Sequence, residues 1–201
     1  KKLKKAEFNK KNITTINGIK YKRLSKAESK GKHDSTGLDY DLFKDSLFDW
    51  AGKTYVYFKI EPIKWRVLSY KNGTAFLLSE YGLDYEEYNT ELKDITWAEC
   101  TLRIWLNDGF IKSAFNSKER KLIKTTSLKN NDNPKYGTEG GKKTKDKIYL
   151  LSLDDFLNPD YGFSTSISEC DENRRCSLTD YTFAMGATKA YTESYMRMFC
   201  L

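Results

Sequence analysis

Two short runs of β-forming residues, separated by an Asn-Gly pair, form the clearest pattern in the sequence. The runs cover residues 63–70 and 75–78, and Asn72 and Gly73 lie between them. Asn and Gly both accept positive φ, so the pair predicts a tight hairpin turn whose twist suits the flanking strands. Polar and apolar residues alternate in the first strand, which predicts that it is half exposed. The unbroken apolar run 76–78 predicts that the second strand is buried on both faces.

A buried helix is predicted between residues 96 and 106. Thr96 and Glu99 have the spacing of a capping box, and apolar residues follow on most sides of the helix. Asn107, Asp108 and Gly109 then give a stop signal. Trp97 and Trp105 are therefore expected in the core. Further short helices are predicted at 38–50, at 110–115, at 117–124 after a Ser117 cap, after Ser152 with Asp155, and after Ser177 with Asp180 as far as Gly186.

The remaining segments complete an α+β pattern. Strands are predicted at 54–60 and 147–152, with a short strand around the Asn-Gly pair within 13–21. Residues 82–94 form an acidic, tyrosine-bearing surface loop, and the polar stretch 130–146 predicts a long loop outside the core. Strands and helices alternate without a regular strand–helix–strand rhythm. The prediction is one α+β domain with a mixed or antiparallel sheet and short helices.

Charge divides the chain unequally. Residues 1–32 hold twelve Lys or Arg residues and two Glu residues, a net charge of +10. The remaining residues have a net charge of −3, so the whole chain has a net charge of +7. We therefore predict a basic N-terminal arm, residues 1–36, before a domain of residues 37–201. Such an arm can bind nucleic acid or anionic surfaces. A solvated linker explains the lysines more simply, because no Arg-rich or aromatic readout pattern accompanies them, so no specific nucleic-acid partner is predicted.

Membrane and metal signals are absent from the sequence. No run of 18 apolar residues occurs, so no membrane span is predicted. The sequence starts at Lys1 without a signal-peptide pattern, which a removed leader or a trimmed sequence would explain equally well. Four cysteines without a paired Cys-x-x-Cys spacing, and a single His33 in the arm, predict neither a metal site nor a cofactor. Cys170 and Cys176 are a disulfide candidate in an oxidising compartment, the alternative being two unrelated thiols.

Several ordered pieces of the sequence carry a resemblance to a known family. They are PIKWRVL at 62–68, YNT at 88–90, ITWAECTLRIWLND at 95–108, AFNSKERKLI at 114–123, TKDKIYLLSLDD at 144–155 and RRCSLTDYTFAMGA at 174–187. In this order they resemble an uncharacterised bacterial domain family, a domain of unknown function found on secreted or surface proteins of Gram-positive gut bacteria. The resemblance covers about residues 52–200. It implies a C-type-lectin-like fold related to that of the formylglycine-generating enzymes.

The resemblance implies a non-catalytic binding or structural module, with an extracellular or cell-surface location and a carbohydrate or protein ligand. The candidate ligand-binding residues are Tyr85, Tyr88 and Asn89 of the tyrosine-bearing loop, together with three charged residues in the matching pieces, Arg103, Arg174 and Asp180. Aromatic faces and amides suit sugars and peptides, although packing at the rim of the core would also explain the tyrosines.

Two alternative chemistries have weaker signals. A formylglycine-generating-type oxidase would need a reactive cysteine pair, and Cys170 and Cys176 lack the expected surrounding sequence. Lectin calcium sites use Glu-Pro-Asn and Trp-Asn-Asp, whereas this chain has Glu-Pro-Ile at 61–63 and Trp-Leu-Asn-Asp at 105–108. With a single histidine in the arm, no catalytic residue is predicted.

The end of the sequence also departs from the family. Family members continue past a cysteine matching Cys200 into a Trp-rich segment, whereas this sequence ends at Leu201. The domain is therefore expected to be truncated at its C-terminus. Residues 191–201 combine several apolar residues with little charge, so self-association through this segment is predicted.

Overall fold

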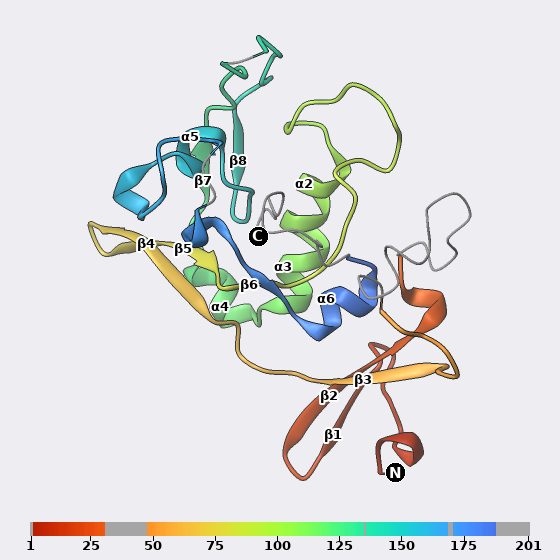
Figure 1. Ribbon diagram of the computed structural model, residues 1–201. Helices are drawn as coiled ribbons and strands as arrows, with labels where there is room; N and C mark the ends of the chain where they lie inside the picture. Colours follow the sequence, from red (N-terminus) through yellow and green to blue (C-terminus); the bar gives the residue numbers. More distant parts are fainter. Residues whose placement is uncertain (1, 31–47, 135, 169–170, 188–201) are drawn as a thin grey trace. The chain divides into compact units, whose positions relative to one another are not determined.

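The computed structural model describes residues 2–30, 48–134, 136–168 and 171–187. It has a mixed α+β architecture of small sheets and short helices (Figure 1). The chain forms two compact units, and each is described by itself below. Unit 1 contains residues 1–85 and 170–200, and unit 2 contains residues 86–169 and Leu201. The predicted α+β class is confirmed.

A three-stranded antiparallel sheet lies in unit 1, in the order β1–β2–β3. Its strands are β1 (Ile13–Ile16), β2 (Ile19–Ser25) and β3 (Tyr55–Lys59). Asn17 and Gly18 both have positive φ, 51° and 78°, and connect β1 to β2. Single turns of 3-10 helix flank these strands, η1 (Leu3–Lys5) and η2 (Lys26–Glu28). The predicted strand at 54–60 and the short strand within 13–21 are therefore both present.

The core of unit 1 joins residues from both ends of the chain. Leu24 on β2 is only 2% exposed, and it clusters with Trp50, Ala184 and Met185. Ala184 and Met185 belong to α6 (Asp180–Met185), and the hydroxyl of Ser29 donates to the Ala184 carbonyl oxygen at 2.7 Å. The structure thus differs from the expected solvated arm over residues 13–29. The apolar residues there are few, but alternation along β2 places Leu24 on the buried face.

The Asn-Gly hairpin of the sequence is confirmed as β4 (Trp65–Lys71) and β5 (Thr74–Ser79), which pair antiparallel. Asn72 and Gly73 have φ of 51° and 71°. A bulge between Val67 and Ser69 interrupts the alternation of β4. The prediction that β5 is buried on both faces is wrong, because Leu77 is 42% exposed while Leu78 is buried.

Unit 1 also contains a short parallel strand pair. β6 (Tyr81–Gly82) pairs with β9 (Ser177–Leu178), and the hydroxyl of Thr182 donates to the Gly82 carbonyl oxygen at 2.6 Å. Thr179 caps α6 by accepting from the Thr182 amide, so the predicted helix is present and its cap lies two residues after Ser177. A 3-10 turn, η6 (Glu172–Arg174), precedes β9.

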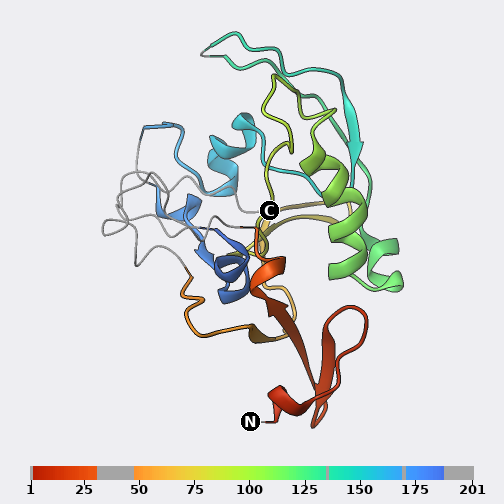
Figure 2. The same cartoon turned by 90° about the vertical axis from the view of Figure 1, so that its right-hand side faces the viewer.

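One continuous helical rod dominates unit 2 (Figures 1 and 2). It consists of α2 (Thr101–Trp105), a π-helical turn η4 (Leu106–Phe110) and α3 (Ile111–Ala114), and α4 (Ser117–Leu122) follows it. The predicted stop at residues 107–109 is therefore wrong. Apolar residues do not surround the helix either, since Ile104 is 58% exposed whereas Leu106 is fully buried.

Helix caps in unit 2 agree with the sequence at one position and differ at two. Ser152 and Asp155 form the predicted capping box of α5 (Leu153–Phe156). Asn116, one residue before the predicted cap, receives the first amides of α4. The predicted box of Thr96 and Glu99 does not form. Residues 97–99 instead make a turn, and Cys100 is the N-cap residue before α2.

The two-stranded sheet of unit 2 includes residues from the stretch where the sequence predicts a loop. β7 (Thr126–Leu128) pairs antiparallel with β8 (Thr144–Asp146), whose residues Thr144 and Asp146 are buried. Residues 147–152 contain no strand, so the predicted strand is wrong. The strand observed in this part of the chain is β8, which ends at Asp146. A 3-10 turn, η5 (Pro159–Tyr161), completes the unit.

Other predictions fall outside the described residues. The predicted helix at 38–50 lies mostly in 31–47, and the predicted self-association segment 191–201 lies wholly outside. Cys170 and Cys200 also lie outside the described residues. Within the ranges that the structure describes, no helix has the length and apolarity needed to cross a membrane.

Gly140 lies very close to the backbone on the other side of the loop between β7 and β8, and this close approach gives a testable prediction. A Cβ on Gly140 would overlap the backbone oxygens of Asn130 and Asn131. We expect Gly140→Ala to lower the free energy of unfolding by about 2 kcal/mol or more, as overpacking against immobile atoms does. Chemical denaturation measures this loss.

Gly137 provides the matched control in the same loop. It has a φ of 65°, and a Cβ there would meet open space. Gly137→Ala should therefore cost only the backbone strain, about 1 kcal/mol. Equal losses for the two variants would contradict the close approach at Gly140.

Candidate functional site

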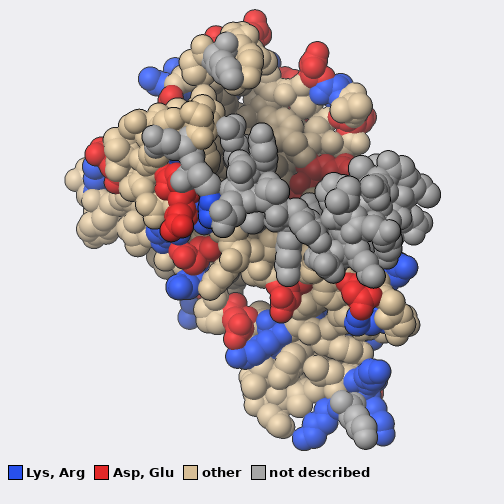
Figure 3. All heavy atoms as spheres, in the orientation of Figure 1, with Lys and Arg blue, Asp and Glu red and all other residues tan. Residues whose placement is uncertain are grey.

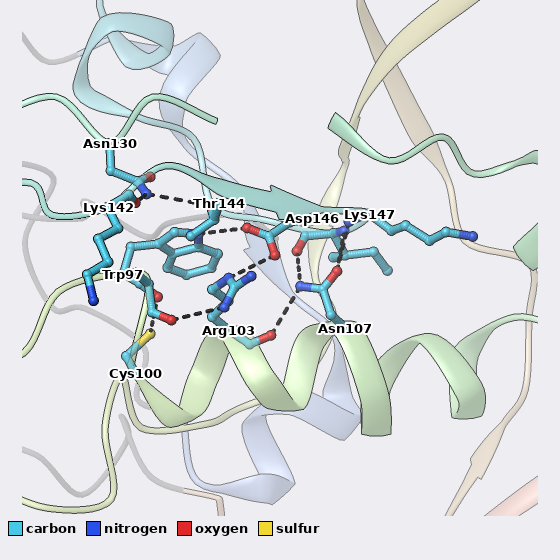
Figure 4. A network of polar contacts seen from close by, with 11 residues as sticks. Trp97, Cys100, Arg103, Asn107, Asn130, Lys142, Thr144, Asp146 and Lys147 are labelled. Atoms are coloured by element: carbon cyan, nitrogen blue, oxygen red, sulfur yellow. Dashed lines mark hydrogen bonds and ion pairs between the residues drawn. The ribbon is translucent and has the colours of Figure 1, made fainter. Parts of the chain in front are cut away.

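A buried carboxylate lies at the centre of unit 2. Asp146, on β8, is only 1% exposed, and both of its oxygens are bonded (Figure 4). Oδ1 accepts from Nε of Arg103 at 2.8 Å, and Oδ2 accepts from the indole Nε1 of Trp97 at 3.1 Å. An ionised carboxylate this deeply buried requires such partners, because an unpaired buried charge is very costly. The Asp146 carboxylate thereby links β8 to α2 and to the turn before it.

Arg103 also holds the segment that leads into α2. One terminal nitrogen of its guanidinium, Nη1, donates to the Ala98 carbonyl oxygen at 2.9 Å. The thiol of Cys100 is fully buried and donates to the Trp97 carbonyl oxygen at 3.5 Å. These two bonds stabilise the turn at 97–99. The sequence pattern predicts instead that Thr96 and Glu99 cap a helix that begins there.

Asn107 fixes the chain that follows β8. Its Oδ1 accepts from the amides of Lys147 and Ile148, at 2.8 and 3.3 Å. Its Nδ2 donates to the carbonyl oxygens of Ile148, at 2.9 Å, and Arg103, at 3.1 Å. The Asn107 side chain thus bonds to the non-helical segment after β8 and to the Arg103 carbonyl oxygen in α2. With these bonds the helix continues through a sequence that resembles a stop.

The tyrosine-bearing loop covers the start of α2. Oδ1 of Asn89 accepts from the Thr101 amide at 3.2 Å, and the Tyr88 carbonyl oxygen accepts from the Leu102 amide at 3.2 Å. The Thr90 amide in turn donates to the Thr101 hydroxyl at 3.0 Å. These bonds satisfy amides that a helix start leaves without an intrahelical partner. The loop is therefore held in one position by the helix that it caps.

Tyr88 combines a fixed backbone position with partial exposure to solvent. Its side chain remains partly in solvent, with the residue 43% exposed. Burial of its hydroxyl raises the pKa of Tyr88 to about 12, and the neighbouring Cys100 thiol raises it further through its charge and a hydrogen bond. The hydroxyl therefore stays protonated at neutral pH. The geometry gives a partly exposed tyrosine on a loop whose backbone is bonded to α2.

The Asn89 cap gives a prediction for stability. Asn89→Ala removes the acceptor for the Thr101 amide and should lower the free energy of unfolding by about 1 kcal/mol, as lost caps do. Asn89→Asp keeps an acceptor oxygen and should recover most of that loss. Denaturant unfolding of both variants measures the difference. An alanine variant as stable as the parent chain would show that the amide of Thr101 needs no cap from this loop.

The structure separates the six candidate ligand-binding residues into two groups. Tyr88, Asn89 and Arg103 come together around the first turn of α2 in unit 2. The other three lie in unit 1. Tyr85 packs against the core cluster of Leu24 and Trp50, Arg174 is buried in an ion pair with Asp171 at 3.3 Å, and Asp180 is the exposed first residue of α6.

Residues that organise the site were missed by sequence reasoning. Asp146 and Thr144 stand in a lysine-rich polar stretch, and only their two-residue spacing, typical of one face of a strand, could have indicated burial. Asn107 has the sequence context of a helix stop. Trp97 was expected in the core, but the role of its indole N–H as a hydrogen-bond donor to Asp146 had no sequence signal.

Thiols and metal ligands can be placed in part. Cys100 is a free thiol, whereas Cys176 is in a disulfide whose partner lies outside the described residues. The pairing of Cys170 with Cys176 therefore stays a prediction. Asp108 of the Trp-Leu-Asn-Asp string is exposed and forms an ion pair with Lys112. Among the residues that the structure describes, no group of three or more His, Cys, Asp or Glu residues is suitably placed to hold a metal ion.

Comparison of the sequence with known families gives one match. Residues 72–195, more than half of the chain, match the family described as Domain of unknown function (DUF6273). The chain belongs to DUF6273. Asp146, its partners Arg103 and Trp97, and the capping loop with Tyr88 and Asn89 all lie within the DUF6273 match. The strands β1 to β3 precede it.

The DUF6273 assignment confirms the predicted membership of an uncharacterised domain family. No curated protein and no solved structure matches the chain. The family match therefore gives the domain its name and extent, and the fold is described by its α+β elements alone.

Proposed function

We propose that this DUF6273 chain is a non-catalytic binding module of a bacterial secreted or surface protein, and that residues 87–94 form its ligand-binding surface. The observation that carries this proposal is the exposure of Tyr88 and Leu92 on a loop that is fixed to the start of α2. Leu92 is fully exposed. Binding residues on loops held by a rigid scaffold are the usual arrangement in recognition modules. The ligand class is a carbohydrate or a protein.

The bonding of the polar groups in unit 2 supports binding rather than catalysis. Both oxygens of Asp146 are bonded, and the Cys100 thiol is buried. A general acid, base or nucleophile must reach a substrate atom within hydrogen-bond distance. Arg103 keeps 24% of its side chain in solvent and bonds to Asp146 and the Ala98 carbonyl oxygen, so it acts as a support for the surface.

The finer fold and the location belong to the same proposal. Small sheets, short helices and long ordered loops are compatible with the C-type-lectin-like fold that the family resemblance implies. The disulfide at Cys176 supports an oxidising, extracellular location, because disulfides persist in such compartments. A carbohydrate ligand would stack on the exposed ring of Tyr88, whereas a protein ligand would use Tyr88 and Leu92 together as an apolar contact.

A binding screen with two variants tests the proposal. The full chain is applied to an array of bacterial-surface glycans and to extracellular protein extracts, and the affinity of each hit is measured. Tyr88→Ala and Leu92→Ala should each weaken binding by about tenfold or more, as central contacts do. Tyr70→Ala, which removes another exposed ring, should leave affinity unchanged.

The stability of the variants separates binding from folding. Leu92 is fully exposed, so Leu92→Ala should keep the melting temperature of the parent chain. Ligand binding that is unaffected by both Tyr88→Ala and Leu92→Ala would disprove this surface. A hydrolysed or oxidised ligand would instead indicate an enzyme.

A further inference from the structure

Lysine side chains gather on the N-terminal part of unit 1. Residues 2–30 contain ten Lys or Arg residues and two Glu residues. In Figure 3 blue atoms gather over this segment at the lower end of the view. Seven of its lysines are exposed and take part in no ion pair within the described residues, and five of these are here called the basic surface: Lys4, Lys5, Lys10, Lys11 and Lys20.

Side-chain contacts hold the basic surface on the folded sheet. The guanidinium of Arg23, on β2, lies over the ring of Phe8 at 4.4 Å and over the ring of Tyr55 at 4.5 Å. Its Nη2 donates to Oδ1 of Asn12 at 2.9 Å, and Nδ2 of Asn12 donates to Glu28 at 2.8 Å. Phe8 and Asn12 lie on either side of Lys10 and Lys11. These contacts therefore fix the position of the chain that carries the lysines. In a solvated arm that chain would have no fixed position.

We propose that the basic surface binds a linear polyanion with regularly spaced phosphate groups and no nucleobases. Lysine ammonium groups act as compact point charges for phosphate, and several of them on one folded segment release counterions together when a polyanion binds. A preformed surface also avoids the entropy cost of ordering a flexible arm. This surface and residues 87–94 share no residue, so the two proposals stand or fall separately.

The aromatic groups beside the basic surface argue against a nucleic acid. Proteins that bind single strands stack the bases on exposed aromatic rings, and base edges are commonly read by arginine. Here the rings of Phe8 and Tyr55 both face the guanidinium of Arg23. The single arginine of the segment and its nearest rings are thus engaged with one another, and the lysines supply charge without base recognition.

Titration of the full chain with inorganic polyphosphate tests the proposal. A variant with all five lysines of the basic surface changed to Gln should bind about tenfold or more weakly at about 100 mM NaCl, and its affinity should depend less steeply on salt. The matched control removes five exposed lysines of unit 2 and therefore has the same net charge: Lys118, Lys121, Lys129, Lys143 and Lys145. The control should keep the parent affinity within about twofold. Melting curves verify that both variants fold, and a smaller variant, K10Q with K11Q, replaces the first if it does not.

Three results would overturn the proposal. The first is an absence of polyphosphate binding by the parent chain at moderate salt. The second is a control variant that loses as much affinity as the basic-surface variant, because overall charge and not the surface would then be responsible. The third result comes from a titration with single-stranded DNA at the same phosphate concentration. Binding to it about tenfold more tightly than to polyphosphate would indicate nucleic-acid recognition instead.

Discussion

Asp146→Ala should lower the free energy of unfolding by about 3 kcal/mol, the lower end of the range for breaking a buried ion pair. The variant leaves Arg103 and the indole N–H of Trp97 without their acceptor. The lower end applies because 24% of the Arg103 side chain remains in solvent, where water replaces part of the lost interaction. Denaturant unfolding, followed by the fluorescence of Trp97 and the other tryptophans, measures the loss.

An ion pair on the same helical rod provides the control. Asp108 pairs with Lys112, and both side chains are largely exposed. Asp108→Ala should therefore change stability by less than about 0.5 kcal/mol. Adding Arg103→Met to Asp146→Ala should recover part of the loss, because the double variant no longer buries an unpaired charge. Equal effects of Asp146→Ala and Asp108→Ala would show that the buried carboxylate does not organise unit 2.

Leu24→Ala should cost about 2–5 kcal/mol, although Leu24 stands in the most basic part of the chain. Its side chain is 2% exposed and packs with Trp50, Ala184 and Met185, so the variant leaves a cavity between segments from both ends of unit 1. Calorimetry or denaturant unfolding measures the loss. Leu122→Ala, at a leucine that is largely exposed, should stay within about 0.5 kcal/mol of the parent.

Removal of residues 1–28 extends the same test. The fragment lacks β1 and β2 and would leave β3 and the core around Trp50 without cover. We expect loss of cooperative unfolding for unit 1. A fragment with the melting temperature of the full chain would show that the N-terminal segment is an independent arm.

Local rules predicted the parts of the fold that local chemistry decides. The Asn72-Gly73 pair formed the expected turn, because positive φ at both positions depends on those residues alone. The box of Ser152 and Asp155 formed because its two side chains and the amides that they bond lie within three residues of one another. In the candidate site, the sequence indicated the loop of Tyr88 and Asn89 and the position of Arg103 on a helix.

Long-range partners decided the parts that the sequence did not predict. Asn107 has the local signature of a helix stop, yet its amide binds backbone groups of residues 147 and 148, and that contact favours a π-helical turn. Asp146 is an acidic residue in a polar stretch, and only the pairing with Arg103 makes its burial possible. A single-sequence pattern contains no information on which distant residue will provide such a partner.

The discontinuity of unit 1 has a consequence for the order in which the protein is completed on the ribosome. Residues 1–85 emerge from the ribosome first, but their core is completed only by Ala184 and Met185. The Gly82 carbonyl oxygen likewise has its hydrogen-bond donor, Thr182, one hundred positions later in the chain. Residues 86–169 of unit 2 are synthesised in between. Contacts so distant in sequence form slowly, and apolar surface that waits for them is prone to aggregation. A ribosome that stalls before β9 would therefore expose an N-terminal half without its closing segment, which makes nascent unit 1 the part most dependent on chaperones.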